Sequence, residues 1–142
     1  MMERAPLVST IIAIGLLPVA FFFVHAFLSG LRGWRYHKTT GLLAVSWDLS
    51  MSIGYMLYRT FGGEVEGGAL QLGGPILAYF AVHGLVALIV MALEVAVLVT
   101  GLMGWRREDP MPVHGRLAKP LFFLWWFAFL SGELFYLVIY II

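Results

Sequence analysis

Residues 75–103 of this 142-residue chain read PILAYFAVHGLVALIVMALEVAVLVTGLM, and this stretch decides the fold. It is apolar except for three side chains, His83, Glu94 and Thr100. The hydrocarbon core of a membrane is about 30 Å thick, and a helix needs about 20 apolar residues to cross it. The stretch therefore predicts a membrane-spanning helix. His83 and Glu94 are about three helical turns apart on one face, which we expect to look into a helix bundle because ionisable groups are costly in lipid.

The composition places the whole chain in a membrane. It is 61% hydrophobic and 12% charged, with a mean hydropathy of +0.91, which is too apolar for a soluble domain. The absence of cysteine excludes disulfides, thiolate metal sites, cysteine catalysis and covalent c-type haem attachment. The chain has no motif of a hydrolase or nucleotide enzyme, and no nucleic-acid partner is expected. A haem-binding or assembly protein is favoured over a stand-alone enzyme, although enzymatic activity stays open.

The apolar segments and the basic residues predict a topology. A single transmembrane domain, residues 1–142, is expected to contain spans at about 7–31, 41–59, 75–104 and 120–142. Seven of the nine Lys and Arg residues fall in the connecting segments 32–40 and 105–119. Because short basic loops face the cytoplasm, both segments are predicted to be cytoplasmic, with segment 61–74 and both termini outside. The prediction is an all-α polytopic protein of the cytoplasmic (inner) membrane, an antiparallel four-transmembrane-helix bundle whose halves loosely repeat.

The four histidines are candidate cofactor ligands. His37 and His114 are predicted at the cytoplasmic boundary, and His25 roughly 9 Å inside it. A b-type haem between helices needs two ligands at matching depth on facing helices, which this inner group supplies. His83 is predicted roughly 10 Å from the outer surface, where it would need Met56, an open position or a histidine brought near by tilt. If no haem binds, His25, His83 and His114 could hold a metal ion. For His37 and His114, the alternative is a solvated or phospholipid-facing side chain.

Carboxyl groups inside the predicted spans suggest a second role. Asp48 and Glu94 are expected near the midplane and close to one another, and Glu133 roughly 13 Å from the outer surface. Tyr55 shares the polar face of the second predicted span with Asp48. Such a ladder of buried groups is suited to relaying protons or accepting them from a quinol, so a proton path or a bound quinone is predicted. The alternative for each residue alone is a helix-to-helix hydrogen bond.

Four motifs carry a resemblance to a known family. They are RYHKTTGLLA at the start of the second predicted span, GYMLYR at its end, AYFAVHGLVAL in the third, and HGRLAKPLFFLWWFAFLSGELFYLVIY in the last. Their order and spacing resemble integral membrane proteins of the YozB/CtaM type, the domain of unknown function 420 family. By this resemblance His37, His83 and His114 fall on family histidines, whereas the first span aligns poorly and gives His25 no role. The resemblance implies haem handling and maturation of a haem-copper terminal oxidase.

These observations lead to three functional hypotheses. The first is a membrane protein that binds haem b and acts in respiratory-chain electron transfer or in maturation of a haem-copper terminal oxidase. The second is a non-catalytic membrane subunit of a respiratory complex, whose polar stripes bind partner helices and lipid. The third is a small proton-coupled or metal transporter. The expected partners are membrane lipid, subunits of a terminal oxidase or another respiratory complex, and a second copy of the chain.

Overall fold

The protein is a bundle of long helices. The computed structural model describes residues 6–61 and 74–141, and within these ranges it contains helices and no strand. This confirms the predicted all-α four-helix membrane bundle. The helices are α1 (Leu7–Arg32), α2 (His37–Thr60), α3 (Gly74–Arg107) and α4 (Pro112–Tyr140).

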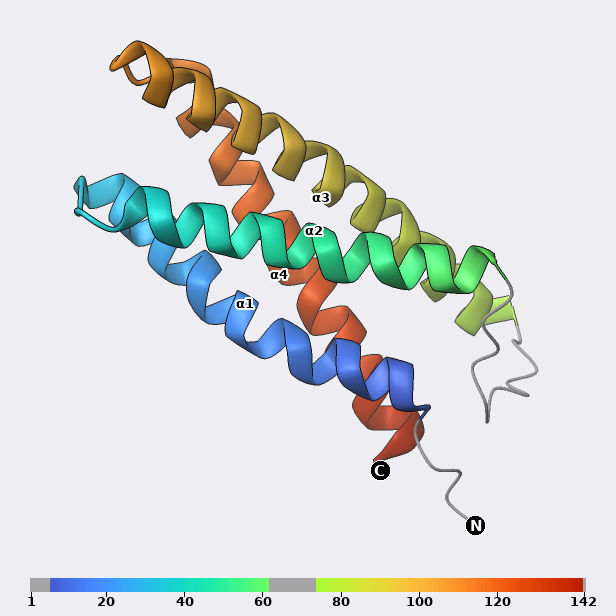
Figure 1. The fold of residues 1–142 in the computed structure, drawn as a ribbon. Helices are drawn as coiled ribbons and strands as arrows, with labels where there is room; N and C mark the ends of the chain where they lie inside the picture. The colour runs from blue at the N-terminus through green and yellow to red at the C-terminus, as the bar shows by residue number, and fades with distance from the viewer. Residues whose placement is uncertain (1–5, 62–73, 142) are drawn as a thin grey trace.

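Three of the helices are long and apolar enough to cross a membrane on their own. They are α1, α3 and the part of α4 from Pro112 to Val138. α2 has 24 residues, but it does not reach the same hydropathy, because Asp48 and several serines interrupt it. α2 instead packs against α1, to which a short turn joins it (Figure 1). The kind of membrane and the side on which the termini lie stay predictions.

The helices α2 and α4 begin several residues before the predicted spans do. The turns occupy only residues 33–36 and 108–111, where longer loops at 32–40 and 105–119 were predicted. His37 and His114 therefore lie in the first turns of α2 and α4, because hydropathy marks the bilayer whereas a helix can continue beyond it. Gly33, with a φ of 65°, closes α1 in the left-handed region, and Pro112 starts α4, where its fixed φ suits a first helical position. The predicted outer loop, apart from Phe61 and Gly74, lies outside the described residues.

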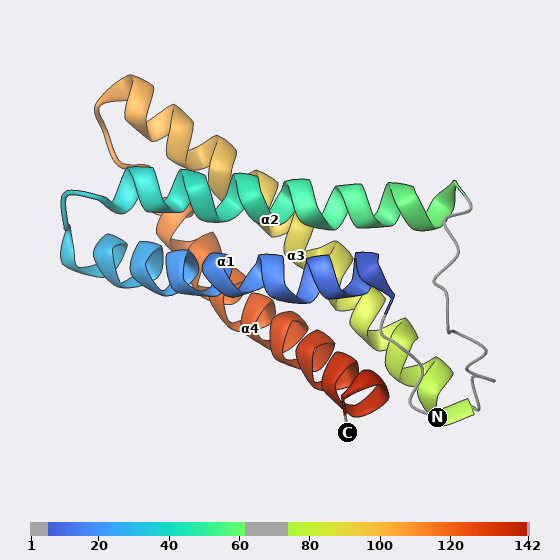
Figure 2. The same cartoon turned by 60° about the horizontal axis from the view of Figure 1, so that its bottom comes forward.

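The four helices form two antiparallel hairpins, α1–α2 and α3–α4. Beyond these hairpin contacts, α1 packs on α4 and α2 packs on α3. Both hairpin turns lie at the same end of the molecule (Figures 1 and 2), which we call the turn end. This arrangement agrees with the prediction that the two basic segments share one side of the membrane.

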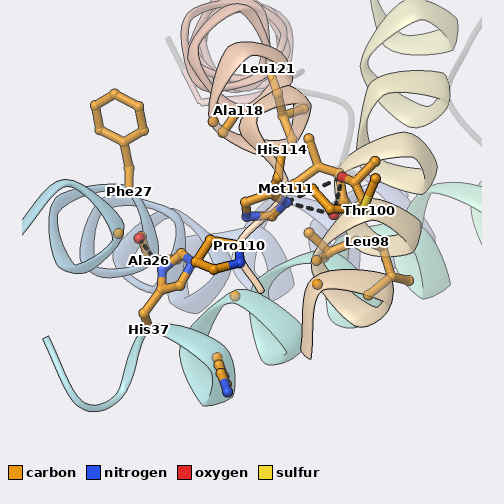
Figure 3. Close-up of a pocket in the computed structure, with 18 of the residues that line it drawn as sticks. Ala26, Phe27, His37, Leu98, Thr100, Pro110, Met111, His114, Ala118 and Leu121 are labelled. Atoms are coloured by element: carbon orange, nitrogen blue, oxygen red, sulfur yellow. Dashed lines mark hydrogen bonds between the residues drawn. The ribbon is translucent and has the colours of Figure 1, made fainter. Parts of the chain in front are cut away.

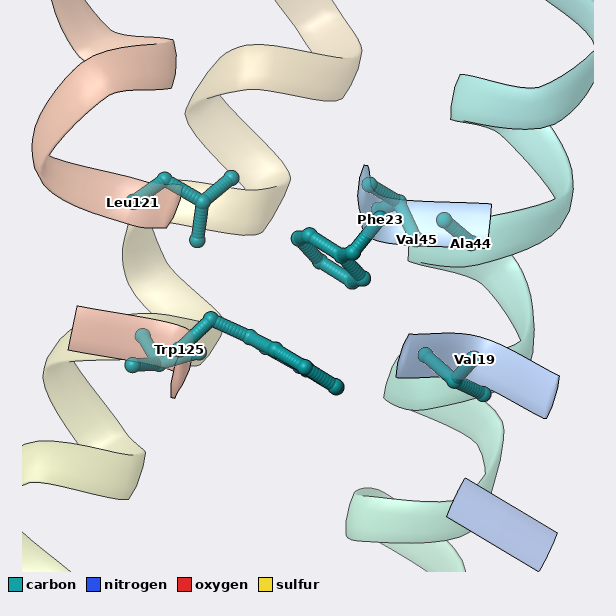
Figure 4. Close-up of a cluster of buried hydrophobic side chains, with 7 residues drawn as sticks. Val19, Phe23, Ala44, Val45, Leu121 and Trp125 are labelled. Carbon is teal, nitrogen blue, oxygen red and sulfur yellow. The ribbon is translucent and has the colours of Figure 1, made fainter. Parts of the chain in front are cut away.

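The buried core lies between the two hairpins and receives side chains from all four helices (Figure 4). The Trp125 ring of α4 stacks on the Phe23 ring of α1, with centroids 4.4 Å apart and planes 13° apart. The core therefore joins the two hairpins. Its buried hydrophobic members are Val19, Phe23, Ala44, Val45, Val90, Leu121 and Trp125.

Candidate functional site

A cavity of about 1120 Å³ lies at the turn end and is lined by all four helices. His37 from α2 and His114 from α4 both line it, and both are half-buried. Their ring centroids are 6.0 Å apart and their planes make an angle of 75° (Figure 3). The structure therefore brings together two histidines that come from different hairpins.

His37 and His114 are oriented by equivalent hydrogen bonds. His37 Nδ1 is 2.8 Å from the Ala26 carbonyl oxygen, and His114 Nδ1 is 3.0 Å from the Val97 carbonyl oxygen. A carbonyl oxygen can only accept, so each Nδ1 carries hydrogen and donates it. In a neutral imidazole the other nitrogen, Nε2, then has a free lone pair. Within the described part of the chain, neither Nε2 makes a hydrogen bond.

A hydroxyl group and a glycine complete the contact around each of these rings. Ser29 Oγ is 3.5 Å from His37 Nδ1, and Thr100 Oγ1 is 3.2 Å from His114 Nδ1. The glycine that follows each hydroxyl residue lies against the imidazole. A Cβ atom on Gly30 would lie 2.8 Å from His37 Cε1, and a Cβ on Gly101 would lie 3.0 Å from His114 Cε1. Neither position has room for a side chain unless the ring moves.

The other two histidines are held by hydroxyl groups alone. His25 Nδ1 is 3.0 Å from Thr40 Oγ1, and His83 Nδ1 is 2.9 Å from Ser131 Oγ. Each hydroxyl already donates to a carbonyl oxygen of its own helix, so it accepts from the histidine. As in the first pair, Nδ1 carries hydrogen and Nε2 has the lone pair.

His25 and His83 lie away from the His37–His114 pair. His25 does not line the cavity, and its ring centroid is 6.1 Å from that of Trp34. His83 lies on the far half of α3, where Tyr79 stacks on it at 6.4 Å and also donates a hydrogen bond to the Ser131 carbonyl oxygen. Among residues 6–61 and 74–141, no three His, Cys, Asp or Glu side chains form a group that could hold a metal ion. The set of His25, His83 and His114 is thus not gathered into one site.

A pair of carboxyl groups lies at the centre of the bundle, deeper than the cavity. Asp48 is 4% exposed and Glu94 is fully buried. Trp125 Nε1 donates to Asp48 Oδ1 at 2.9 Å, and Ser52 Oγ donates to Asp48 Oδ2 at 3.4 Å. The Glu94 carboxyl contacts that of Asp48, and no N–H or O–H group of the described residues donates to it.

The remaining members of the predicted ladder are separate from this pair. Tyr55 on α2 and Glu133 on α4 are half-buried and lie towards the end opposite the turns. Neither contributes to the electrostatic surroundings of Asp48 or Glu94. Instead of a continuous ladder, the structure shows one carboxyl pair and two side chains nearer the other end.

The cavity also carries positive charge. Lys38, Arg116 and Lys119 line it, together with Glu108 and Asp109. The Lys38 ammonium group is held near the cavity by the Trp105 ring, whose centroid is 4.9 Å from Nζ. Three cations against two carboxylates favour an anionic ligand at this end of the molecule.

One signal in the sequence connects all four histidines. The chain contains four Ser/Thr–Gly dipeptides, at residues 29–30, 40–41, 100–101 and 131–132, and the hydroxyl of each lies near one histidine Nδ1. Each pair joins the two helices of one hairpin. This recurrence could have marked the helix faces that receive the histidines, but sequence reasoning did not use it.

Comparison with known proteins finds no matching family model, no similar curated protein and no similar solved structure. The resemblance to the YozB/CtaM-type family therefore rests on the sequence motifs alone.

Proposed function

We propose that this protein binds haem b in the turn-end cavity, where His37 and His114 would hold it. It acts in respiratory-chain electron transfer or in the maturation of a haem-copper terminal oxidase. The observation that carries the proposal is the pair of imidazoles 6.0 Å apart, each with its Nδ1 at hydrogen-bond distance from a backbone carbonyl oxygen.

The spacing of the two rings fits an iron between them. With an iron-to-nitrogen distance of about 2 Å, two imidazoles on opposite sides of one iron have centroids roughly 6 Å apart. A carbonyl acceptor on the second nitrogen is the usual way in which a protein orients a metal-binding histidine. These contacts support His37 and His114 as the two residues that would hold the iron.

The surroundings suit the rest of the cofactor. Pockets for small ligands and cofactors measure about 300–1,000 Å³, and the cavity, at about 1120 Å³, has room for a large flat molecule. Haem b carries two carboxylate side groups, which Lys38, Arg116 and Lys119 would attract. Bound haem supplies reversible one-electron chemistry, while these residues orient it and set its electrostatic surroundings. The respiratory part of the proposal is supported by the motif resemblance.

The proposal is tested by the optical spectrum of the purified protein, oxidised and then reduced. We expect Soret and α bands that are lost in both His37→Ala and His114→Ala. The matched control is His25→Ala, which we expect to keep the bands because His25 does not line the cavity. A colourless chain that co-elutes with oxidase or reductase subunits at fixed stoichiometry would instead identify it as a non-catalytic subunit.

A further inference from the structure

The contact between Asp48 and Glu94 requires a proton. Both side chains are buried, and no lysine, arginine or histidine of residues 6–61 and 74–141 is among the groups that act on either carboxyl. Two carboxylates in contact without water or a counterion would repel strongly. A shared proton removes this repulsion and turns the contact into a hydrogen bond.

The donors around the pair show which residue carries the proton. Asp48 accepts from Trp125 Nε1 and from the Ser52 hydroxyl, one donor at each carboxylate oxygen. Glu94 is fully buried, and neither of its carboxyl oxygens meets a donor from the described residues. Hydrogen bonds to the charged form favour it, so Asp48 is the carboxylate. Glu94 is then the carboxylic acid that donates to it.

The carboxyl pair lies next to the turn-end cavity, on the side towards the centre of the bundle. Ala44 and Val97 line the cavity and are four and three residues from Asp48 and Glu94 on the same helices. One helical turn rises about 5.4 Å, so water in the cavity comes within about one turn of both carboxyl groups. On the other helices the pair meets Trp125 of α4, whose ring is covered by Phe23 of α1. The cavity therefore comes within about one helical turn of the pair along both α2 and α3.

We propose that Asp48 and Glu94 form a binding site for one exchangeable proton, which enters and leaves through the turn-end cavity. The ligand is the proton alone, and no covalent bond or electron transfer is involved. Such a site can neutralise charge that appears in the cavity without moving a larger ion into the bundle. The proposal does not depend on haem binding, and its test uses the purified protein whether or not it carries a cofactor.

The proton is detected by infrared spectroscopy of the carbonyl band of protonated carboxylic acids. We expect this band at neutral pH and a shift of the band in D₂O. Glu94→Gln should remove it, whereas the control Glu133→Gln should leave it, because Glu133 lies apart from the pair. Asp48→Asn should retain the band at a shifted frequency, because the acceptor changes from a carboxylate to an amide. Absence of the band in the wild type, its persistence in Glu94→Gln, or failure to shift in D₂O would overturn the proposal.

The entry route is tested by the rate at which deuterium shifts the band. Ala118 lines the cavity (Figure 3), and in Ala118→Trp the indole would occupy part of it, seven residues before Trp125 on the same helix. We expect exchange to slow several-fold. The matched control is Phe123→Trp on the same helix, where the side chain is 68% exposed at the bundle surface and exchange should stay at the wild-type rate. An unchanged rate in Ala118→Trp would contradict entry through the cavity.

Discussion

The two hairpins, α1–α2 and α3–α4, present the same spacing of residues to the turn-end cavity. In each, the first helix supplies a carbonyl oxygen, then a hydroxyl residue three positions later and a glycine directly after it. The second helix supplies a histidine in its first turn. The equivalent sets are Ala26, Ser29, Gly30 and His37 in one hairpin, and Val97, Thr100, Gly101 and His114 in the other.

The equivalence between the two hairpins extends seven residues further along each helix, into the core. Val19 and Val90 lie seven residues before Ala26 and Val97, and both valines are buried. Seven residues after the two histidines come Ala44 and Leu121, which are buried as well. Because the same positions reach the core in both halves, the hairpins pack against one another as near-equivalent units.

The hairpins differ at the level of the carboxyl pair. The position of Phe23 in α1 is taken by Glu94 in α3, and the position of Asp48 in α2 is taken by Trp125 in α4. The α1–α4 contact is consequently an aromatic stack, whereas the α2–α3 contact is a pair of carboxyl groups. The histidines and their supporting contacts occur in both hairpins and suit a proposed ligand that is held from both sides. The two carboxyl groups have no equivalent on the α1–α4 side and suit the binding of a single proton.

The largest effect is expected from adding a side chain at the glycines that lie against the histidine rings in both hairpins. Gly30→Ala and Gly101→Ala push a Cβ against the histidine rings, so each should weaken haem binding up to about a hundredfold, or about 2.7 kcal/mol. Haem titration of the purified variants measures this. Gly84→Ala is the control, because a Cβ there meets nothing within 4 Å. Equal haem affinities in all three variants would contradict the idea that Gly30 and Gly101 position the two histidine rings.

The next largest effect is expected at the contact between Asp48 and Glu94, which joins α2 to α3. Asp48→Ala removes the acceptor of Trp125 and the partner of Glu94, which leaves buried polar groups unsatisfied. We expect a loss of about 2 kcal/mol in stability. Denaturation in detergent measures it against Ser46→Ala, an exposed serine of the same helix that should change stability by less than about 0.5 kcal/mol. Similar losses in the two variants would show that the carboxyl pair does not hold α2 to α3.

A smaller effect should separate two neighbouring tryptophans. Trp125→Phe keeps a ring to stack on Phe23 but removes the donor to Asp48, and should lower stability by about 1 kcal/mol. Trp126→Phe removes a buried Nε1 that has no partner among the described residues, so stability should hold or rise slightly. Thermal denaturation of both variants tests this. The reverse order would contradict the assignment of Trp125 as the donor that bridges the hairpins.

The smallest effect should come from the hydroxyl groups beside His37 and His114. Thr100→Val and Ser29→Ala each remove a group near Nδ1 while leaving the stronger carbonyl acceptor in place, so haem affinity should fall roughly twofold to fivefold. The effect should be larger for Thr100, at 3.2 Å, than for Ser29, at 3.5 Å. Haem titration of each variant checks this order, which a larger loss in Ser29→Ala would contradict.

Most of the fold was accessible from the sequence. The apolar runs and the two basic segments predicted an all-α bundle of four helices, and the expectation that Glu94 lies near Asp48 agrees with their contact. The early starts of α2 and α4 were missed, because a hydropathy pattern reports burial in lipid and not the hydrogen bonding that continues a helix past the lipid. His37 and His114 were therefore assigned to loops.

The choice between the inner histidines could not be made from the sequence. Residue counting places His25, His37 and His114 towards the same cytoplasmic end of the membrane, and it gives only their depth. Whether a histidine ring lines the cavity depends on how the two hairpins cross and on which group accepts a hydrogen bond from its Nδ1. His25 finds Thr40 within its own hairpin and stays outside the cavity, whereas His37 lies at the seam where the hairpins meet.

The central claim, that His37 and His114 share one haem iron, is tested most directly by near-infrared magnetic circular dichroism of the oxidised protein. This spectrum reports the chemical identity of both axial ligands. We predict the signature of two imidazoles in the wild type and of one imidazole with one thioether in His114→Met. A five-coordinate or high-spin spectrum in the wild type, or an unchanged ligand pair in both His37→Met and His114→Met, would contradict the account.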